Sequence, residues 1–285
     1  MIDVKIGINT WVWVSPFRTD AFHLLTKIKD MGFDLVEIAV EEPNEIDLPQ
    51  LKEILNELDL AVSICGAFGA QRDISSEDEH IRRLGKDYII QCIRMAEFLG
   101  SHLVAGPFYS AGGKARMVSQ ELRKREREWC VNNLREIAEV ASNCGVIMGM
   151  EPLNRFETDM INVVDQAIEL IRDVGRPEYR IHLDTFHANI EEKSIPDAIR
   201  KLGDGLLCHL HACENDRGIP GTGHIDWLGV REALIDIQYE GAVVIESFTP
   251  GVKEIAKAAS IWRPLAASQD LLAAEGARFL KDLLR

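Results

Sequence analysis

The sequence lacks the long apolar run that a transmembrane helix requires. No apolar stretch reaches the ~20 residues needed to span a bilayer. The start of the chain, MIDVKIGINT, does not place a charged segment before an apolar one, as a secretory signal does. We therefore expect no membrane partner and a cytoplasmic protein.

Paired cysteines and an excess of positive charge are missing as well. The six cysteines include no C-x-x-C pair, and a chain of 285 residues is too long for a disulfide-stapled scaffold, so we expect reduced thiols. The 32 basic side chains are outnumbered by 46 acidic ones, which gives a net charge of −14. Because such a surface repels phosphate backbones, we expect no nucleic-acid partner.

No G-x-G-x-x-G motif follows the first apolar run, which weakens the case for a dinucleotide-binding fold. The sequence does contain a repeated pattern, in which short apolar runs are each followed by a stretch of helical periodicity. The eight runs are 4–9, 35–40, 60–66, 102–108, 146–152, 179–184, 206–212 and 242–247. Strands that alternate with helices pair in parallel. Eight such units predict a closed (β/α)8 TIM barrel of the α/β class, with residues 1–285 as a single domain.

Two segments are longer than this pattern needs. Residues 66–80 follow the third predicted strand, and residues 107–120 follow the fourth. TIM-barrel enzymes build their active sites from the loops at the carboxyl ends of the strands. We therefore expect both loops at the rim of a site.

Polar side chains end four successive predicted strands: Glu151, Asp184, His211 and Glu246. The carboxyl ends of parallel strands meet at one face of a barrel, so these side chains are expected to converge. Residues two apart in a strand share a face. His209 should therefore lie one layer below His211, where it packs in the barrel or orients a neighbour.

Three carboxylates buried together repel one another and lose hydration, and a divalent cation relieves both effects. A site of three carboxylates and one imidazole suits Mn²⁺, Co²⁺ or Mg²⁺ better than structural zinc. We expect Mn²⁺ as the first candidate, bound by all four strand-end residues.

At these residues the sequence resembles the ketose 3-epimerases (the D-tagatose 3-epimerase and D-allulose 3-epimerase group) of the xylose isomerase-like TIM barrel superfamily. The resemblance rests on EPLNRFE at 151–157, LDTFHANIEE at 183–192 and HLHACENDRGIPG at 209–221. The segments VVIESF at 243–248 and SIWRPLA at 260–266 agree with it. One departure is at Gly7, which is followed by Ile8 and Asn9 where family members often carry an aromatic residue.

The resemblance implies a role for each matching residue. Glu151 and Glu246 would be both metal ligands and the catalytic acid–base pair. Substrate contacts would come from Glu157, His187 and Arg217. Recognition of the sugar beyond C3 would involve Trp13, Cys65, Pro107 and Phe248, within a wider set that also includes Trp11, Phe17, Phe68 and Phe108.

The expected reaction is metal-dependent epimerisation at C3 of a free ketose, of the D-tagatose, D-allulose/D-fructose or L-ribulose type. It would proceed through a cis-enediolate with two glutamates as acid and base. The resemblance also implies a homodimer or homotetramer. An aldose–ketose isomerase of the same superfamily, of the hydroxypyruvate or small-sugar kind, would use the same residues. An apurinic-site endonuclease would need several metals and a basic face, and a non-catalytic sugar-binding barrel would not need both glutamates.

Overall fold

The computed structural model describes residues 2 and 4–285. Eight parallel strands close into a barrel, each hydrogen-bonded to its neighbours in chain order, and β8 pairs with β1. This confirms the predicted TIM barrel. The strands are β1 (Ile6–Asn9), β2 (Leu35–Val40), β3 (Ala61–Gly66), β4 (Leu103–Gly106), β5 (Ile147–Met150), β6 (Tyr179–Asp184), β7 (Leu207–His211) and β8 (Ala242–Ile245).

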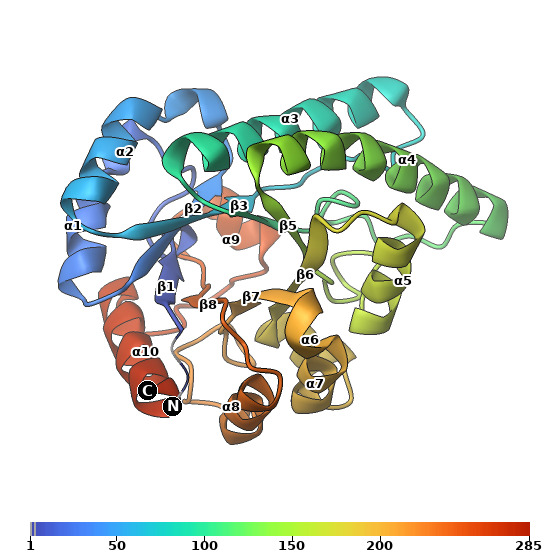
Figure 1. Ribbon diagram of the computed structural model, residues 1–285. Helices are drawn as coiled ribbons and strands as arrows, with labels where there is room; N and C mark the ends of the chain where they lie inside the picture. The colour runs from blue at the N-terminus through green and yellow to red at the C-terminus, as the bar shows by residue number, and fades with distance from the viewer. Residues whose placement is uncertain (1, 3) are drawn as a thin grey trace.

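The helices form an outer layer around the barrel (Figure 1). They are α1 (His23–Asp30), α2 (Leu48–Glu57), α3 (Glu79–Leu99), α4 (Gln120–Cys144), α5 (Val164–Val174), α6 (Thr185–Glu191), α7 (Ile195–Leu206), α8 (Trp227–Asp236), α9 (Lys253–Ala258) and α10 (Gln269–Leu284). The last helix, α10, packs against β1 and brings the termini side by side, and the backbone N–H of Ile2 donates to the carbonyl of Leu284 at 3.1 Å.

Local sequence explains where the long helices begin and end. The side chain of Asp78 caps the first turn of α3, and that of Ser119 caps α4, each satisfying a backbone N–H that the helix cannot. Both helices end at a glycine in the left-handed region, Gly100 with φ 82° and Gly145 with φ 64°. A side chain with a Cβ adopts that conformation only at a cost, so these glycines fix the turn into β4 and β5.

The strands are buried on both faces, as the continuous apolar runs predict. All six residues of β2 are buried, including the charged Glu37. Strand register then sets the height of the side chains in the barrel. Asp184 at the end of β6 pairs with His211 at the end of β7, so their side chains emerge at the same level.

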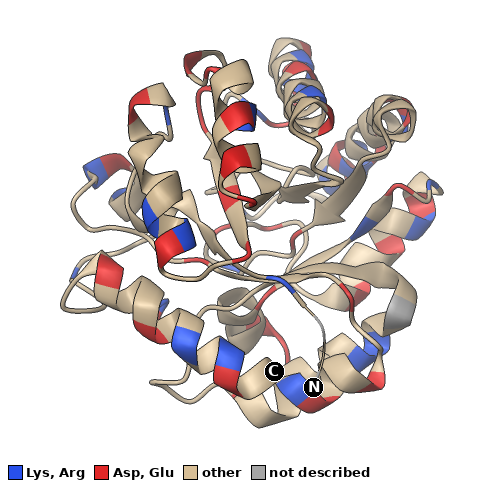
Figure 2. Cartoon of the chain, turned by 60° about the vertical axis from the view of Figure 1, so that its left-hand side comes forward, with Lys and Arg blue, Asp and Glu red and all other residues tan. Residues whose placement is uncertain are grey.

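Basic and acidic residues are both distributed along the outer helices (Figure 2). No helix among the described residues is both long and apolar enough to cross a membrane. At the carboxyl face of the barrel, the predicted rim segments 66–80 and 107–120 are tied to each other: the Lys114 ammonium contacts a carboxylate oxygen of Asp73 at 2.8 Å and one of Glu126 at 3.0 Å. This buried ion-pair cluster holds the two loops over the barrel mouth.

Candidate active site

The four predicted strand-end residues converge at the carboxyl face of the barrel. Ligand-type atoms of Glu151, Asp184 and His211 all lie within 4.8 Å of one another, and oxygens of Asp184 and Glu246 are equally close. Nδ1 of His211 is 3.4 Å from Oε1 of Glu246. All four side chains are buried. Their closeness is the consequence of parallel strands that end at one level.

The pKa shifts and the unpaired nitrogen of these four side chains are those expected of a cation site. Burial, and then the charge of Glu246, raise the pKa of Glu151 well above its usual value. Burial also raises the pKa of Asp184 to about 6. Nδ1 of His211 is buried without a hydrogen-bond partner. A divalent cation would neutralise the carboxylates and occupy that nitrogen, so the residues fit the metal that the sequence predicts.

Glu37, at the centre of β2, holds His211 from across the barrel interior. Nε2 of His211 lies 2.5 Å from Oε1 of Glu37, which also accepts a hydrogen bond of 2.9 Å from the side-chain amide of Asn9. The hydroxyl of Ser63 donates to the other Glu37 oxygen at 3.0 Å. Burial would raise the pKa of Glu37, but the charges of His211 and His209 bring it well below its usual value. An ionised carboxylate only accepts hydrogen bonds, so Nε2 of His211 donates to Glu37, and Nδ1 is the ring nitrogen left to face a cation. Burial would lower the pKa of His211, but the charges of Glu37 and Glu246 raise it well above its usual value, so a cation at Nδ1 would displace a proton.

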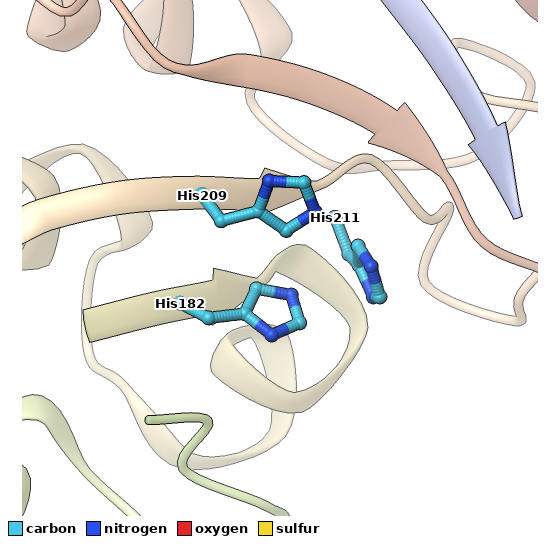
Figure 3. A group of neighbouring side chains, drawn as sticks. All are labelled: His182, His209 and His211. Atoms are coloured by element: carbon cyan, nitrogen blue, oxygen red, sulfur yellow. The ribbon is translucent and has the colours of Figure 1, made fainter. Parts of the chain in front are cut away.

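Two further histidines lie beside this pair (Figure 3). His209 is one layer below His211 on β7, as strand alternation predicts, with Nε2 2.7 Å from Oε2 of Glu37. His182 comes from β6, and its ring centroid is 4.0 Å from that of His211. Nδ1 of His182 lies 3.7 Å from a carboxylate oxygen of Glu151. Burial lowers the pKa of His182 well below its usual value, so its ring is neutral.

Arg217 closes the top of the site. Its Nη1 lies 2.5 Å from Oε2 of Glu246 and 3.2 Å from Oδ2 of Asp184. Its Nη2 is 3.0 Å from Nε2 of His187. The guanidinium is also held between the rings of Phe186, at 4.2 Å, and Phe248, at 4.8 Å. Stacking fixes the plane of the guanidinium, and charge pairing fixes its direction.

A cavity of about 610 Å³ opens above these residues. The sequence-predicted residues that line it are Glu151, Glu157, His187, Arg217, Glu246, Cys65, Pro107, Phe248, Trp11 and Phe68. Asp184 and His211 are fully buried below its floor. Residues 66–72 and Gly112–Gly113 form part of the wall, so both predicted rim loops border the cavity.

Three residues predicted to recognise the sugar do not line the cavity: Phe17 and Phe108 are buried in the hydrophobic core, and Trp13 lies on another face. The turn Thr10–Val12 after β1 directs Trp11 into the cavity wall. Trp13 faces α10 instead, where its Nε1 donates to Asp270 at 2.8 Å. The cavity wall therefore carries Trp11, stacked on Phe248 with ring centroids 5.5 Å apart, and the expected role of Trp13 has no support from its position.

Sequence reasoning missed Glu37 and His182. Glu37 is a single charge inside the apolar run LVEIAV, and His182 lies two residues before Asp184 in YRIHLD. A charge in the middle of a strand that is apolar on both faces has to be paired inside the barrel. Strand alternation places His182 on the face of Asp184, so both signals were present in the pattern.

Comparison with known proteins identifies the family. Residues 25–283 match the xylose isomerase-like TIM barrel family. Over 270 residues the chain is 33% identical to the D-psicose 3-epimerase of Ruminiclostridium cellulolyticum, an alignment that covers 94% of this chain and 92% of that protein. The chain belongs to the ketose 3-epimerase family of xylose isomerase-like TIM barrels.

Other ketose 3-epimerases agree over the same length. The L-ribulose 3-epimerase of Mesorhizobium japonicum is 32% identical over 279 residues, covering 97% of this chain and 93% of that protein. The crystal structure of the D-allulose 3-epimerase of a Methylomonas species in complex with D-allulose superposes with a TM-score of 0.91 at 28% identity, covering 98% of this chain and 96% of that one. The predicted resemblance and the prediction of an enzyme are thereby confirmed.

Proposed function

We propose that this ketose 3-epimerase inverts C3 of a free ketose of the D-tagatose, D-allulose/D-fructose or L-ribulose type. The observation that carries the proposal is the convergence of four strand-end side chains, in which Nδ1 of His211 is buried without a hydrogen-bond partner and two glutamates line the same cavity. Mn²⁺ is the proposed ion, with Co²⁺ or Mg²⁺ as substitutes, held by Glu151, Asp184, His211 and Glu246. When bound, the ion supplies Lewis-acid polarisation of the ketose carbonyl.

The two glutamates supply the proton transfers. The hydrogen at C3 is acidic because it neighbours the C2 carbonyl, and its removal leaves a cis-enediolate. Inversion requires that one group takes the proton from one face and another returns a proton to the opposite face. Glu151 and Glu246 follow β5 and β8 and so approach from different sides of the barrel. Such positioned acid–base catalysis contributes about 10²–10⁴-fold in rate.

The environments of the two glutamates differ in the way that this chemistry needs. Burial raises the pKa of Glu151. Burial would also raise the pKa of Glu246, but the charges of His211 and Arg217 lower it to about 2. A pair of carboxyl groups with opposed pKa shifts separates an acid from a base. Arg217 and His187, whose polar atoms are 3.0 Å apart, are placed to hold the oxygens next to C3.

The size and the wall of the cavity are consistent with a free ketose as substrate. Its volume of about 610 Å³ is within the range of small-molecule sites, and Cys65, Pro107 and Phe248 lie on its wall together with Trp11. A panel of free ketoses, assayed with Mn²⁺, Co²⁺ and Mg²⁺ after chelation, would rank substrates and ions. We also expect a homodimer or homotetramer in the cytoplasm, which light scattering on the purified protein and cell fractionation would test.

The position of a solvent-derived label tests the reaction. The protein with Mn²⁺ is incubated with D-fructose in deuterated water. Deuterium at C3 with formation of D-allulose is expected for an epimerase. Deuterium at C1 with formation of an aldose would establish an aldose–ketose isomerase instead. The Glu246→Gln variant is the control, since it should still bind the sugar but introduce no label at either carbon.

A further inference from the structure

A second group of ligand-type side chains lies beneath the four strand-end residues. His182, His209 and His211 are fully buried, and one ring nitrogen from each lies within 4.8 Å of those of the others. His182 and His209 are register partners on β6 and β7, which is why their rings meet inside the barrel (Figure 3). The proposed epimerase reaction uses neither His182 nor His209.

Several nitrogens of this three-histidine cluster have no polar partner, although Nε2 of His209 and Nε2 of His211 face the Glu37 carboxylate. Both ring nitrogens of His182 and Nδ1 of His209 are buried and unpaired. An unsatisfied buried polar atom destabilises the fold, and such atoms in a native structure call for a ligand, a water or an ion. An imidazole lone pair is a strong ligand for borderline metal ions.

The carboxylate of Glu37 lies beside the same rings. Oε2 of Glu37 lies 2.7 Å from Nε2 of His209, and Oε1 lies 2.5 Å from Nε2 of His211. With Glu37, the cluster offers three nitrogens and one carboxylate oxygen. That set differs from the oxygen-rich set above it and suits a four-coordinate zinc-like ion.

We propose that His182, His209, His211 and Glu37 form a second divalent-cation site, selective for Zn²⁺ or Co²⁺, directly below the four strand-end ligands. His211 is shared: Nδ1 faces the upper site and Nε2 the lower one. Binding at the lower site displaces the Nε2 proton, which leaves to solvent. Two nitrogens on a tetrahedral zinc are about 3.4 Å apart, a spacing compatible with ring nitrogens that all lie within 4.8 Å of one another.

The fold provides a separate route to this lower site. A cavity of about 390 Å³ lies at the amino ends of the strands, where its lining includes Ser63, Cys208 and His209. This is the face opposite the substrate cavity. Because His209 borders this cavity, an ion entering from the amino face would not have to pass the sugar.

Metal stoichiometry tests the proposal. The full chain is stripped with a chelator and dialysed against Zn²⁺ alone, and bound zinc per chain is measured by mass spectrometry. We expect two zinc ions per wild-type chain and one in His182→Asn. His80→Asn, which changes an exposed histidine, is the matched control and should keep two. A single zinc in the wild type, or two in His182→Asn, would overturn the proposal.

Cobalt spectroscopy keeps the test independent of folding defects and of the epimerase proposal. Tetrahedral Co²⁺ with nitrogen ligands absorbs visible light far more strongly than octahedral Co²⁺ in oxygen ligands. The wild type titrated with Co²⁺ should develop the intense band, and Glu151→Gln should keep it although the upper site is damaged. A wild-type spectrum with only weak octahedral bands at saturation would contradict the lower site while leaving the upper site and the epimerase reaction intact.

Discussion

Nε2 of His211 lies 2.5 Å from Oε1 of Glu37, although the two residues are 174 positions apart in the chain. β2 and β7 are not neighbours in the barrel, so this contact crosses the interior. It fixes both the tautomer and the direction of the imidazole. The proposed upper metal site would therefore depend on a side chain that contributes no ligand atom to it.

Glu37→Gln should weaken binding of Mn²⁺ at the upper site. The neutral amide removes the negative charge that fixes the Nε2 proton of His211, so the ring loses the orientation in which Nδ1 faces Glu246. Loss of such a supporting carboxylate typically costs about 10–100-fold in metal affinity. Isothermal titration calorimetry or the electron paramagnetic resonance signal of free Mn²⁺ measures the dissociation constant.

Glu126→Gln is the matched control for that experiment. Glu126 is as buried as Glu37 but pairs with Lys114 and Arg116 outside the site. The Glu126→Gln variant should have a lower free energy of unfolding, while its affinity for Mn²⁺ should equal that of the wild type. Equal affinity losses in both variants would show that general destabilisation, and not the contact with His211, is responsible.

Arg217→Lys should reduce kcat/KM by about 10–100-fold, the equivalent of about 1.5–3 kcal/mol for a hydrogen bond to a charged group. A lysine keeps the charge but cannot reach Glu246, Asp184 and His187 from one planar group. Steady-state kinetics with the best ketose measures the effect. Arg263→Lys, at an exposed arginine 3.1 Å from Asp216, should be unchanged; an unaltered kcat/KM in Arg217→Lys would contradict the assignment.

The barrel and the convergence of the four strand-end side chains could be predicted because both follow from short-range rules. Alternation of apolar runs with helical stretches predicts the (β/α)8 order. A polar residue at the end of a run falls at the carboxyl face whichever strand carries it. The four strand-end residues needed no knowledge of packing, only the period of a strand and the parallel direction of the sheet.

Glu37 and Trp13 show where that reasoning ends. The partner of Glu37 is set by which strands face one another across the closed barrel, and strand pattern alone does not give that distance. The direction of Trp11 and Trp13 depends on a single 3-10 turn after β1, whose backbone rotates successive side chains by about 120°. Neither the strand nor the helix period applies there.

Trp11→Ala and Trp13→Ala should separate substrate recognition from stability. Trp11 is 7% exposed, lines the cavity and stacks on Phe248, so its removal should raise KM for ketoses several-fold and change their ranking. Trp13 packs between Lys27 and Asp270, so its removal should lower the melting temperature with KM unchanged. Kinetics over a ketose panel and thermal unfolding measure the two effects. A larger change in KM for Trp13→Ala would reverse the assignment.

Acid should destabilise the rim of the cavity through Asp159. Burial alone would raise the pKa of Asp159, but hydrogen bonds from Arg123 and Arg116 bring it below its usual value. A carboxyl whose pKa is lower in the folded state stabilises the fold fully above its unfolded pKa of about 3.9, and this contribution is lost as pH falls through the folded pKa. The free energy of unfolding in urea should therefore fall with decreasing pH less steeply in Asp159→Asn than in the wild type below about pH 4.5. Asp173→Asn, at an exposed pair with Arg127, should follow the wild-type slope because surface ion pairs contribute little. Parallel curves for Asp159→Asn and the wild type would show that Asp159 does not couple protonation to the stability of the rim.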